Sequence, residues 1–561
     1  RLNQLSLLLD TQQLQPAQAL ANQIRPLFDR LTPSRDSLYL QINFATQLSR
    51  LPQSDATLTA AQLLTTVAQQ AQTLADPRAE SFAVGQLAHL YEQTQQWDLA
   101  QSLSQRALLL AQTAQANDIA YRWQWQLGRI LKQSDRPTAK TVYQEALSTL
   151  NIIRRDLLAT HPEFQVSFRK DVEPLYRELV ELLIQPGDGV SPVSAEDLQQ
   201  IREVIEALRL AELENFFRSA CLDTVETIDA IDDRAAIFYP ILLPEQLVVI
   251  VSLPGEPLQY HVIPVRQQEV ESLVTTLRRT LILPYTSSRE IQAPAQQLYQ
   301  WLVQPIAERL SAEQIETLVF VQDGALQTVP MSVLYDGDRY LIESYNIALT
   351  PGLRLFEPKP LEQTALTAVT AGLTESRHRF EALAFVEAEL DQIGSAISSD
   401  VLLNQDFTSS ILADKLSNSS APILHIATHG QFSSQADQTF LLAWDQPITV
   451  DRLSSLLQAR DRQTQNLELL VLSACETAVG DNRAVLGLAG IAVQSGARST
   501  LASLWLIDDE STPLLMAQFY QNLKGGQSRA AALRQAQLSL LQGQYRHPRF
   551  WSAFVLLGNW Q

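Results

Sequence analysis

The sequence predicts an α-helical repeat region followed by an α/β domain whose sheet is mostly parallel and flanked by helices. Up to about residue 150, apolar residues recur at three- and four-residue spacing, which is typical of amphipathic helices. After residue 236 the period changes, and short β-branched runs alternate with helical patterns. Alternation of this kind predicts parallel strands connected by helices.

The helical front region repeats itself along the chain. Two sets of mostly small residues are nearly copies of one another: Ala88, Tyr91, Ala100 and Ala107, and then Gly128, Leu131, Ala139 and Ala146. Such residues occupy the positions where the paired helices of tetratricopeptide (TPR) repeats touch, so we predict TPR-like repeats. Stacked helix pairs leave a groove suited to a peptide or protein, although a helical spacer with no ligand fits the same pattern.

Changes of pattern divide the chain into four parts. We predict TPR-like repeats over 1–160, a helical bridge over 161–235, the first half of the α/β domain over 236–360 and its second half over 361–561. The strands we expect are 247–253, 317–321, 366–371, 423–428, 469–473, 500–504 and 553–557, with a helix near 386–397.

The composition excludes several classes of function. A formal net charge of −19 and a pI near 4.9 oppose nucleic-acid binding, because phosphate contacts need a concentrated Lys/Arg surface. No uninterrupted apolar run reaches the roughly 18 residues that a membrane span requires. Two cysteines, Cys221 and Cys475, cannot build a disulfide framework. With no metal-ligand cluster, P-loop or dinucleotide fingerprint visible, we expect no cofactor.

The start of the chain bears on its location. It begins at Arg1 rather than at a methionine, which indicates that an N-terminal segment has been removed. We predict a cytoplasmic protein and leave an exported form open for this reason.

Two predicted strands end in residues that can carry chemistry. The strand at 423–428 is followed by His429 and Gly430, and the strand at 469–473 is followed two residues later by Cys475. Because ligands bind beyond the carboxyl ends of parallel strands, we expect the imidazole and the thiol to share one edge of the sheet. An imidazole beside a thiol favours the nucleophilic thiolate and can protonate a leaving amine. The backbone N–H groups of Gly430 and Cys475 are then the natural pair to stabilise an oxyanion.

A third strand end adds candidates for a substrate pocket. The strand at 500–504 contains Ser503 and runs into Trp505, Asp508 and Asp509, which would add an aromatic wall and two carboxylates to the same edge. The two aspartates are equally compatible with ordinary acids at the start of the following helix.

These segments resemble the CHAT family, caspase-like and separase-like domains associated with TPR repeats. The motifs that carry the resemblance are Leu424–Gly430 (LHIATHG), Leu472–Thr477 (LSACET) and Ser503–Asp509 (SLWLIDD), supported by Val321–Pro330 and Pro548–Gly558. The resemblance implies a bacterial cysteine peptidase of the clan CD type, with a non-catalytic first half and a second half that carries the dyad His429 and Cys475. Leu506 stands directly after Trp505, where relatives such as separase have an acid, so a preference for basic substrates stays open.

Our leading hypothesis is a cysteine endopeptidase that hydrolyses peptide bonds and is regulated or targeted by a protein bound to the repeats. The alternatives are a catalytically silent signalling scaffold with a caspase-like fold and, more remotely, an acyl- or amidotransferase with the same Cys and His chemistry. Cys221 lacks a partner His in the sequence, and His425 lies a full strand length from the rim, so we expect both to be structural.

Overall fold

A computed structural model describes two compact parts of the chain. It covers residues 1–28, 30–52, 54–160, 168, 172–185, 191–217, 232–353, 360–361, 366–377, 380–433, 438–461, 467–473, 476–477, 491, 493, 496–505 and 510–561. Contacts group the chain into Arg1–Val193, here called unit 1, and Ser194–Gln561, here called unit 2. The predicted boundaries at 160, 235 and 360 stay predictions.

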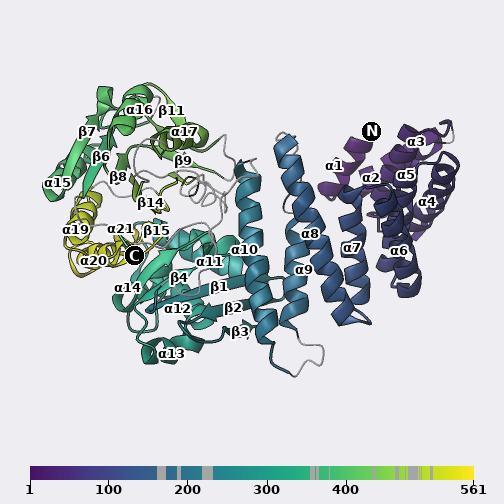
Figure 1. Ribbon diagram of the computed structural model, residues 1–561, viewed down its shortest axis with the longest axis horizontal. Coiled ribbons are helices and arrows are strands. Elements are labelled where there is room, and N and C mark those ends of the chain that lie inside the picture. The colour runs from purple at the N-terminus through teal and green to yellow at the C-terminus, as the bar shows by residue number, and fades with distance from the viewer. Residues whose placement is uncertain are drawn as a thin grey trace. The chain divides into compact units, whose positions relative to one another are not determined.

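Unit 1 consists of helices that pack against their neighbours in the chain (Figure 1). They are α1 (Leu2–Asp10), α2 (Leu14–Phe28), α3 (Arg35–Leu48), α4 (Ser54–Thr73), α5 (Pro77–Gln93), α6 (Trp97–Thr113), α7 (Asn117–Leu131), α8 (Arg136–Thr160) and α9 (Glu173–Ile184). The small residues of the repeat pattern lie at the helix contacts, since Ala88, Ala107 and Ala146 are fully buried. The predicted helical repeats are therefore confirmed.

Two ion pairs in unit 1 each join residues forty positions apart in the sequence, as expected for a repeat array. Arg50 donates to Asp10 at 2.7 Å, and Arg78 forms an ion pair with Asp118. The turns also recur: Ala75, Gln95 and Gln115 have φ angles of 51°, 57° and 51° and follow α4, α5 and α6 respectively. A non-glycine residue rarely adopts a positive φ, so these turns are set by the close packing of successive helices.

Unit 2 is built on one sheet of eleven strands. The strands are β1 (Ala235–Leu243), β2 (Gln246–Ser252), β3 (Gln259–Ile263), β4 (Thr317–Phe320), β5 (Asn346–Leu349), β6 (Thr367–Gly372), β7 (Ser398–Leu403), β8 (Ile423–Ala427), β12 (Leu469–Ser473), β14 (Ser499–Ser503) and β15 (Phe554–Gly558). Their order is β3-β2-β1-β4-β5-β15-β14-β12-β8-β6-β7. A smaller sheet has the order β11-β10-β9-β13, from Pro447–Thr449, Phe440–Leu442, Gly430–Phe432 and Glu476–Thr477.

Most neighbouring strands of the large sheet are parallel, as predicted. The antiparallel pairs are β1 with β2, β2 with β3 and β14 with β15. β15 lies between β5 and β14, so the last of these strands in the sequence joins the strands of the two predicted halves into one sheet. β12 is buried along its whole length, which explains why its sequence, LLVLS, is an almost continuous apolar run.

Helices surround the large sheet of unit 2 (Figure 1). They are α10 (Ala195–Phe217), α11 (Gln267–Ile282), α12 (Ser288–Leu302), α13 (Ala307–Ala312), α14 (Leu341–Ser344), α15 (Val386–Ala396), α16 (Ser409–Asn418), α17 (Val450–Asp461), α19 (Thr512–Lys524), α20 (Arg529–Gln542) and α21 (Pro548–Trp551). Buried ion pairs join Arg209 of α10 to Glu212 and to Asp323 in the loop after β4, and Asp323 also accepts the Leu242 N–H at 2.8 Å. These bonds attach α10 to the sheet.

The two units differ in charge. Unit 1 has 17 Lys and Arg against 18 Asp and Glu, whereas unit 2 has 25 against 43, so almost all of the net charge of −19 belongs to unit 2. Among the described helices, we find no stretch that combines the length and the apolar character needed to cross a bilayer.

Candidate active site

The strand order brings the three predicted motifs to one edge of the sheet. β8 and β12 are parallel neighbours with Ala427 opposite Ser473, and β12 and β14 are parallel neighbours with Leu472 opposite Ala502. Parallel strands in register end at the same edge, where loops converge and side chains can reach a ligand. His429 follows Ala427 by two residues, just as Cys475 follows Ser473 by two residues.

Cys475 lies outside the described residues, but the chain on either side of it is placed. Before it, Ser473 pairs with Ala427 at the end of β8. After it, Glu476 begins β13 and pairs in parallel with Gln431 of β9. The segments that contain His429 and Cys475 are thus paired both before and after these residues.

His429 is held by contacts to its ring and to its backbone. Its Nε2 donates to the Glu381 carbonyl at 2.8 Å, and the Phe380 ring packs against the imidazole with ring centroids 4.9 Å apart. The Leu442 N–H donates to the His429 carbonyl at 2.8 Å. Because a carbonyl oxygen only accepts, Nε2 carries a hydrogen, which leaves Nδ1 as the nitrogen that can exchange a proton.

Gly430 lies directly after His429 as the first residue of β9. It is buried and pairs with Leu441 of β10 on one side, while the next residue of β9, Gln431, pairs with β13. The role of its N–H in an oxyanion hole stays a prediction.

A loop that the sequence interpretation missed lies against His429. It connects β6 to α15, and its described residues, 373–377 and 380–385, include both Phe380 and Glu381. The Leu373 N–H donates to the Ala427 carbonyl at 3.1 Å, and Arg377 and Phe380 exchange backbone hydrogen bonds of 3.2 and 2.8 Å. A cluster of basic residues, Arg377, His378 and Arg379, in an acidic part of the chain was the available signal.

The other pocket candidates have different surroundings. Ser503 is fully buried, and within the described part of unit 2 its hydroxyl has no hydrogen-bond partner. Trp505 is 2% exposed and its indole N–H donates to the Arg549 carbonyl at 3.3 Å, so this ring packs inside unit 2. Asp508 and Asp509 lie outside the described residues. All four stay predictions as pocket residues.

His425 lies four residues before His429 and is fully buried. Its Nε2 bonds to Glu389 of α15 at 3.0 Å, and its Nδ1 bonds to the hydroxyl of Tyr520 of α19 at 3.0 Å. Burial raises the pKa of Tyr520 well above its ordinary value, so the phenol keeps its proton and donates to Nδ1. Both ring nitrogens are occupied within the core, in keeping with a structural role.

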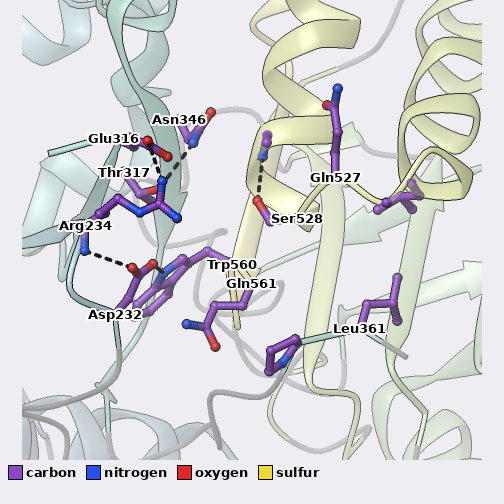
Figure 2. Close-up of a pocket in the computed structure, with 14 residues that line it drawn as sticks. Asp232, Arg234, Glu316, Thr317, Asn346, Leu361, Gln527, Ser528, Trp560 and Gln561 are labelled. Carbon is purple, nitrogen blue, oxygen red and sulfur yellow. Dashed lines mark hydrogen bonds and ion pairs between the residues drawn. The ribbon is translucent and has the colours of Figure 1, made fainter. Parts of the chain in front are cut away.

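A pocket of about 410 Å³ opens at the opposite edge of the sheet (Figure 2). It is lined by residues at the starts of β1, β4 and β5, by the start of α20 and by Trp560. Its charged groups already have partners, because Arg234 pairs with Glu316 at 2.7 Å and Asp232 accepts the Trp560 indole N–H at 2.9 Å. Among the described residues, no group of three or more His, Cys, Asp or Glu is arranged to hold a metal ion.

Comparisons with known proteins assign part of the chain to a family. Residues 292–559 match the model of the CHAT domain, and no curated protein matches the sequence. A solved Saccharomyces cerevisiae separase–securin complex has 10% identity and a TM-score of 0.41, with 98% of this chain and 56% of that chain covered. A Podosopora anserina putative kinesin light chain with TPR-like repeats has 16% identity and a TM-score of 0.25, with 38% and 93% covered. This chain therefore spans little more than half of the separase chain.

Proposed function

Residues 292–559 form a CHAT domain, and from this premise we propose that the chain is a cysteine endopeptidase with His429 and Cys475 as its catalytic dyad. The observation that carries the proposal is the surroundings of His429. Its ring lies at the carboxyl edge of the sheet, the Glu381 carbonyl orients it, and the strand pairs on both sides connect it to the segment that contains Cys475.

In the proposed reaction, the Cys475 thiol first loses its proton to Nδ1 of His429. The thiolate attacks the carbonyl carbon of the scissile bond, a C–S bond forms, and the carbonyl π electrons move to oxygen. When the tetrahedral species collapses, the C–N bond breaks and Nδ1–H protonates the leaving amine. Water then attacks the thioester carbon while Nδ1 accepts its proton. The second tetrahedral species collapses, the C–S bond breaks and the carboxylic acid is released, and Nδ1–H returns its proton to the thiolate.

The hydrogen bond to Glu381 supports this assignment of the two ring nitrogens. A backbone carbonyl cannot take up a proton at neutral pH, so it keeps the ring in one orientation while Nδ1 changes its protonation state. We propose that the N–H groups of Gly430 and Cys475 stabilise the oxyanion, which the pairing of Ser473 with Ala427 and of Glu476 with Gln431 supports.

We further propose that Ser503, Asp508 and Asp509 contribute to the substrate pocket and that Trp505, through Arg549, fixes the segment that contains the two aspartates. The repeats of unit 1 would bind a protein partner that targets or regulates cleavage. The packing of successive helices with small residues at their contacts supports this, because such arrays present extended surfaces to proteins.

The test is covalent labelling of the full chain with acyloxymethyl ketone peptides that carry basic, acidic or apolar residues before the ketone. We expect intact-mass labelling that disappears in Cys475→Ala, falls at least about 100-fold in rate in His429→Ala, and persists in the control Cys221→Ala. Labelling that persists in Cys475→Ala would contradict the proposal. No labelling by any peptide, with candidate partners added, would favour the catalytically silent scaffold.

A further inference from the structure

We propose that Arg377, held against the indole of Trp444, forms a binding subsite for a carboxylate of the peptide substrate beside the catalytic histidine. The inference rests on the proposed peptidase function, which it extends by naming a chemical feature of the substrate. Arg377 belongs to the loop between β6 and α15, and Trp444 lies two residues after β10.

Contacts place this pair next to His429. Arg377 is joined to Phe380 by two backbone hydrogen bonds, and the Phe380 ring packs on the imidazole. On the other side, Leu442 donates to the His429 carbonyl, and Trp444 follows it by two residues. Each partner of the Arg377–Trp444 pair is therefore only a few residues from a group that touches His429.

The guanidinium of Arg377 stacks on an aromatic ring, and no acid among the described residues forms an ion pair with it. Its Cζ lies 3.6 Å from the centroid of the Trp444 ring, a distance that puts the cation on the ring face. Within the described part of the chain, the Arg377 side chain makes no hydrogen bond or ion pair, and its Nε is buried without a partner. A buried donor without an acceptor is costly, which favours an acceptor supplied by a ligand.

Other arginines of unit 2 differ from Arg377 because they form ion pairs with acids. Arg234, Arg309 and Arg529 form ion pairs with Glu316, Glu256 and Glu468. The acids nearest to Arg377 along the chain, Glu375 and Glu381, are exposed, and Asp445 beside Trp444 instead accepts the Ser409 N–H at 3.0 Å. Since no acid in the described part of unit 2 pairs with Arg377, this cation is available to a ligand.

A carboxylate is the group that fits this arrangement best. Stacking uses the flat face of the guanidinium, so its N–H donors stay in the plane and can bind two carboxylate oxygens at once. A peptide that reaches the dyad passes the loop that carries Arg377, because the same loop supplies Phe380 and Glu381 to His429. The predicted substrate is thus a peptide with Asp, Glu or a terminal carboxylate close to the scissile bond.

The experiment compares ketone probes that differ only by Asp or Asn, placed in turn at each position before the ketone. For the position that reaches Arg377, we expect the full chain to be labelled about tenfold faster by the Asp probe. In Arg377→Gln the Asp and Asn probes should react at the same rate. Arg377→Lys and Trp444→Leu should each keep part of the preference for the Asp probe. The control Arg289→Gln removes an exposed arginine of α12 and should keep the full preference.

Each outcome separates this inference from the proposed function. Labelling of Cys475 with the same Asp to Asn ratio in the native chain and in Arg377→Gln would overturn the subsite while the peptidase stands. If no probe labels Cys475, the proposed peptidase function is rejected. The subsite is then tested by measuring the binding of the same peptides, made without the ketone, by fluorescence anisotropy. Tighter binding of the Asp peptide that is lost in Arg377→Gln supports it; equal binding of the two peptides overturns it.

Discussion

The contacts within unit 1 differ in kind from the contacts within unit 2. In unit 1 each helix packs mainly on the helices before and after it, and ion pairs such as Arg50 with Asp10 join residues one repeat apart. In unit 2 neighbouring strands come from distant parts of the sequence, as when β15 lies between β5 and β14. A local change should therefore stay local in unit 1 and spread through the sheet in unit 2.

This difference explains where chemistry can arise. A catalytic group needs partners on several sides, and the parallel sheet supplies them by bringing β6, β8 and β12 to one edge with their loops. A repeat array instead presents the same kinds of residue again and again along a surface, which suits binding. Hydrogen exchange measured by mass spectrometry reports on both units of one molecule, so it can test the comparison directly.

The largest effect on stability is expected for His425→Ala in unit 2. Removing the imidazole leaves the buried Glu389 carboxylate and the Tyr520 hydroxyl without their shared partner, at a cost of about 3 to 5 kcal/mol. Exchange should rise across the strands of unit 2 and stay unchanged in unit 1. His429→Ala, two residues beyond the end of the same strand, is the control and should change stability little. Faster exchange in unit 1 would contradict the independence of the units.

The next effect concerns unit 1 and depends on pH. Burial alone would raise the pKa of Glu92, but hydrogen bonds and charge from His89 and Arg129 lower it to about 2 from an ordinary value of 4.5. A depressed carboxyl pKa stabilises the fold above pH 4.5, and this contribution, on the order of 3 kcal/mol, is lost as the pH falls from about 4.5 to about 2.

Acid titration followed by exchange at α5 and α7 checks this prediction. The variant Glu92→Gln should be less stable at neutral pH and should lose much of the dependence on pH in that window. An acid transition of the same size in the native chain and in Glu92→Gln would show that another group is responsible.

A smaller and more local effect is expected for Gly85→Ala in α5. A Cβ at this position would lie 2.3 Å from ring atoms of the buried Trp123, so the indole must shift, at a cost of about 2 kcal/mol. Exchange should rise in α5 and α7 and remain unchanged in α1 and α2. Gln86→Ala, at the neighbouring half-buried position, is the matched control. A uniform rise over the whole of unit 1 would argue against local behaviour.

The smallest effect is expected for Arg266→Gln. Its ion pair with Glu245 is exposed on both sides, with 68% and 78% of the side chains accessible, and such pairs contribute little. We expect no measurable change in thermal unfolding or in exchange. A clear destabilisation of unit 2 would mean that its excess negative charge makes single surface cations more important than the burial pattern suggests.

Local sequence patterns predict many of the individual helices and strands, because the spacing of apolar residues within a short segment specifies each of them. The expected strand at 469–473 coincides with β12, and the one at 423–428 extends one residue beyond β8. The pattern did not identify β1, where Pro240 interrupts an apolar run, although Pro240 pairs with Val249 in the sheet. It also gave no sign that β15 inserts between β5 and β14, because strand order depends on contacts between distant segments.

The candidate site could be predicted only in part for the same reason. His429 and Gly430 follow a strand, which the sequence shows, and the motifs connect them to Cys475. Glu381 contributes a backbone carbonyl, which no residue type reveals. Arg377 matters through its stacking on Trp444, more than sixty residues further along the chain. The position of Cys475 at the same edge of the sheet as His429 stays a prediction.

The position of β15 has a consequence for the order of events during protein synthesis. Its two neighbours, β5 and β14, are made earlier, so until Phe554–Gly558 leaves the ribosome the two parts of the sheet have exposed edges in place of a shared strand. Unit 1, whose helices need only their neighbours, can fold while the rest is being translated. The repeats of a nascent chain would thus be folded before the sheet that carries His429 can be completed.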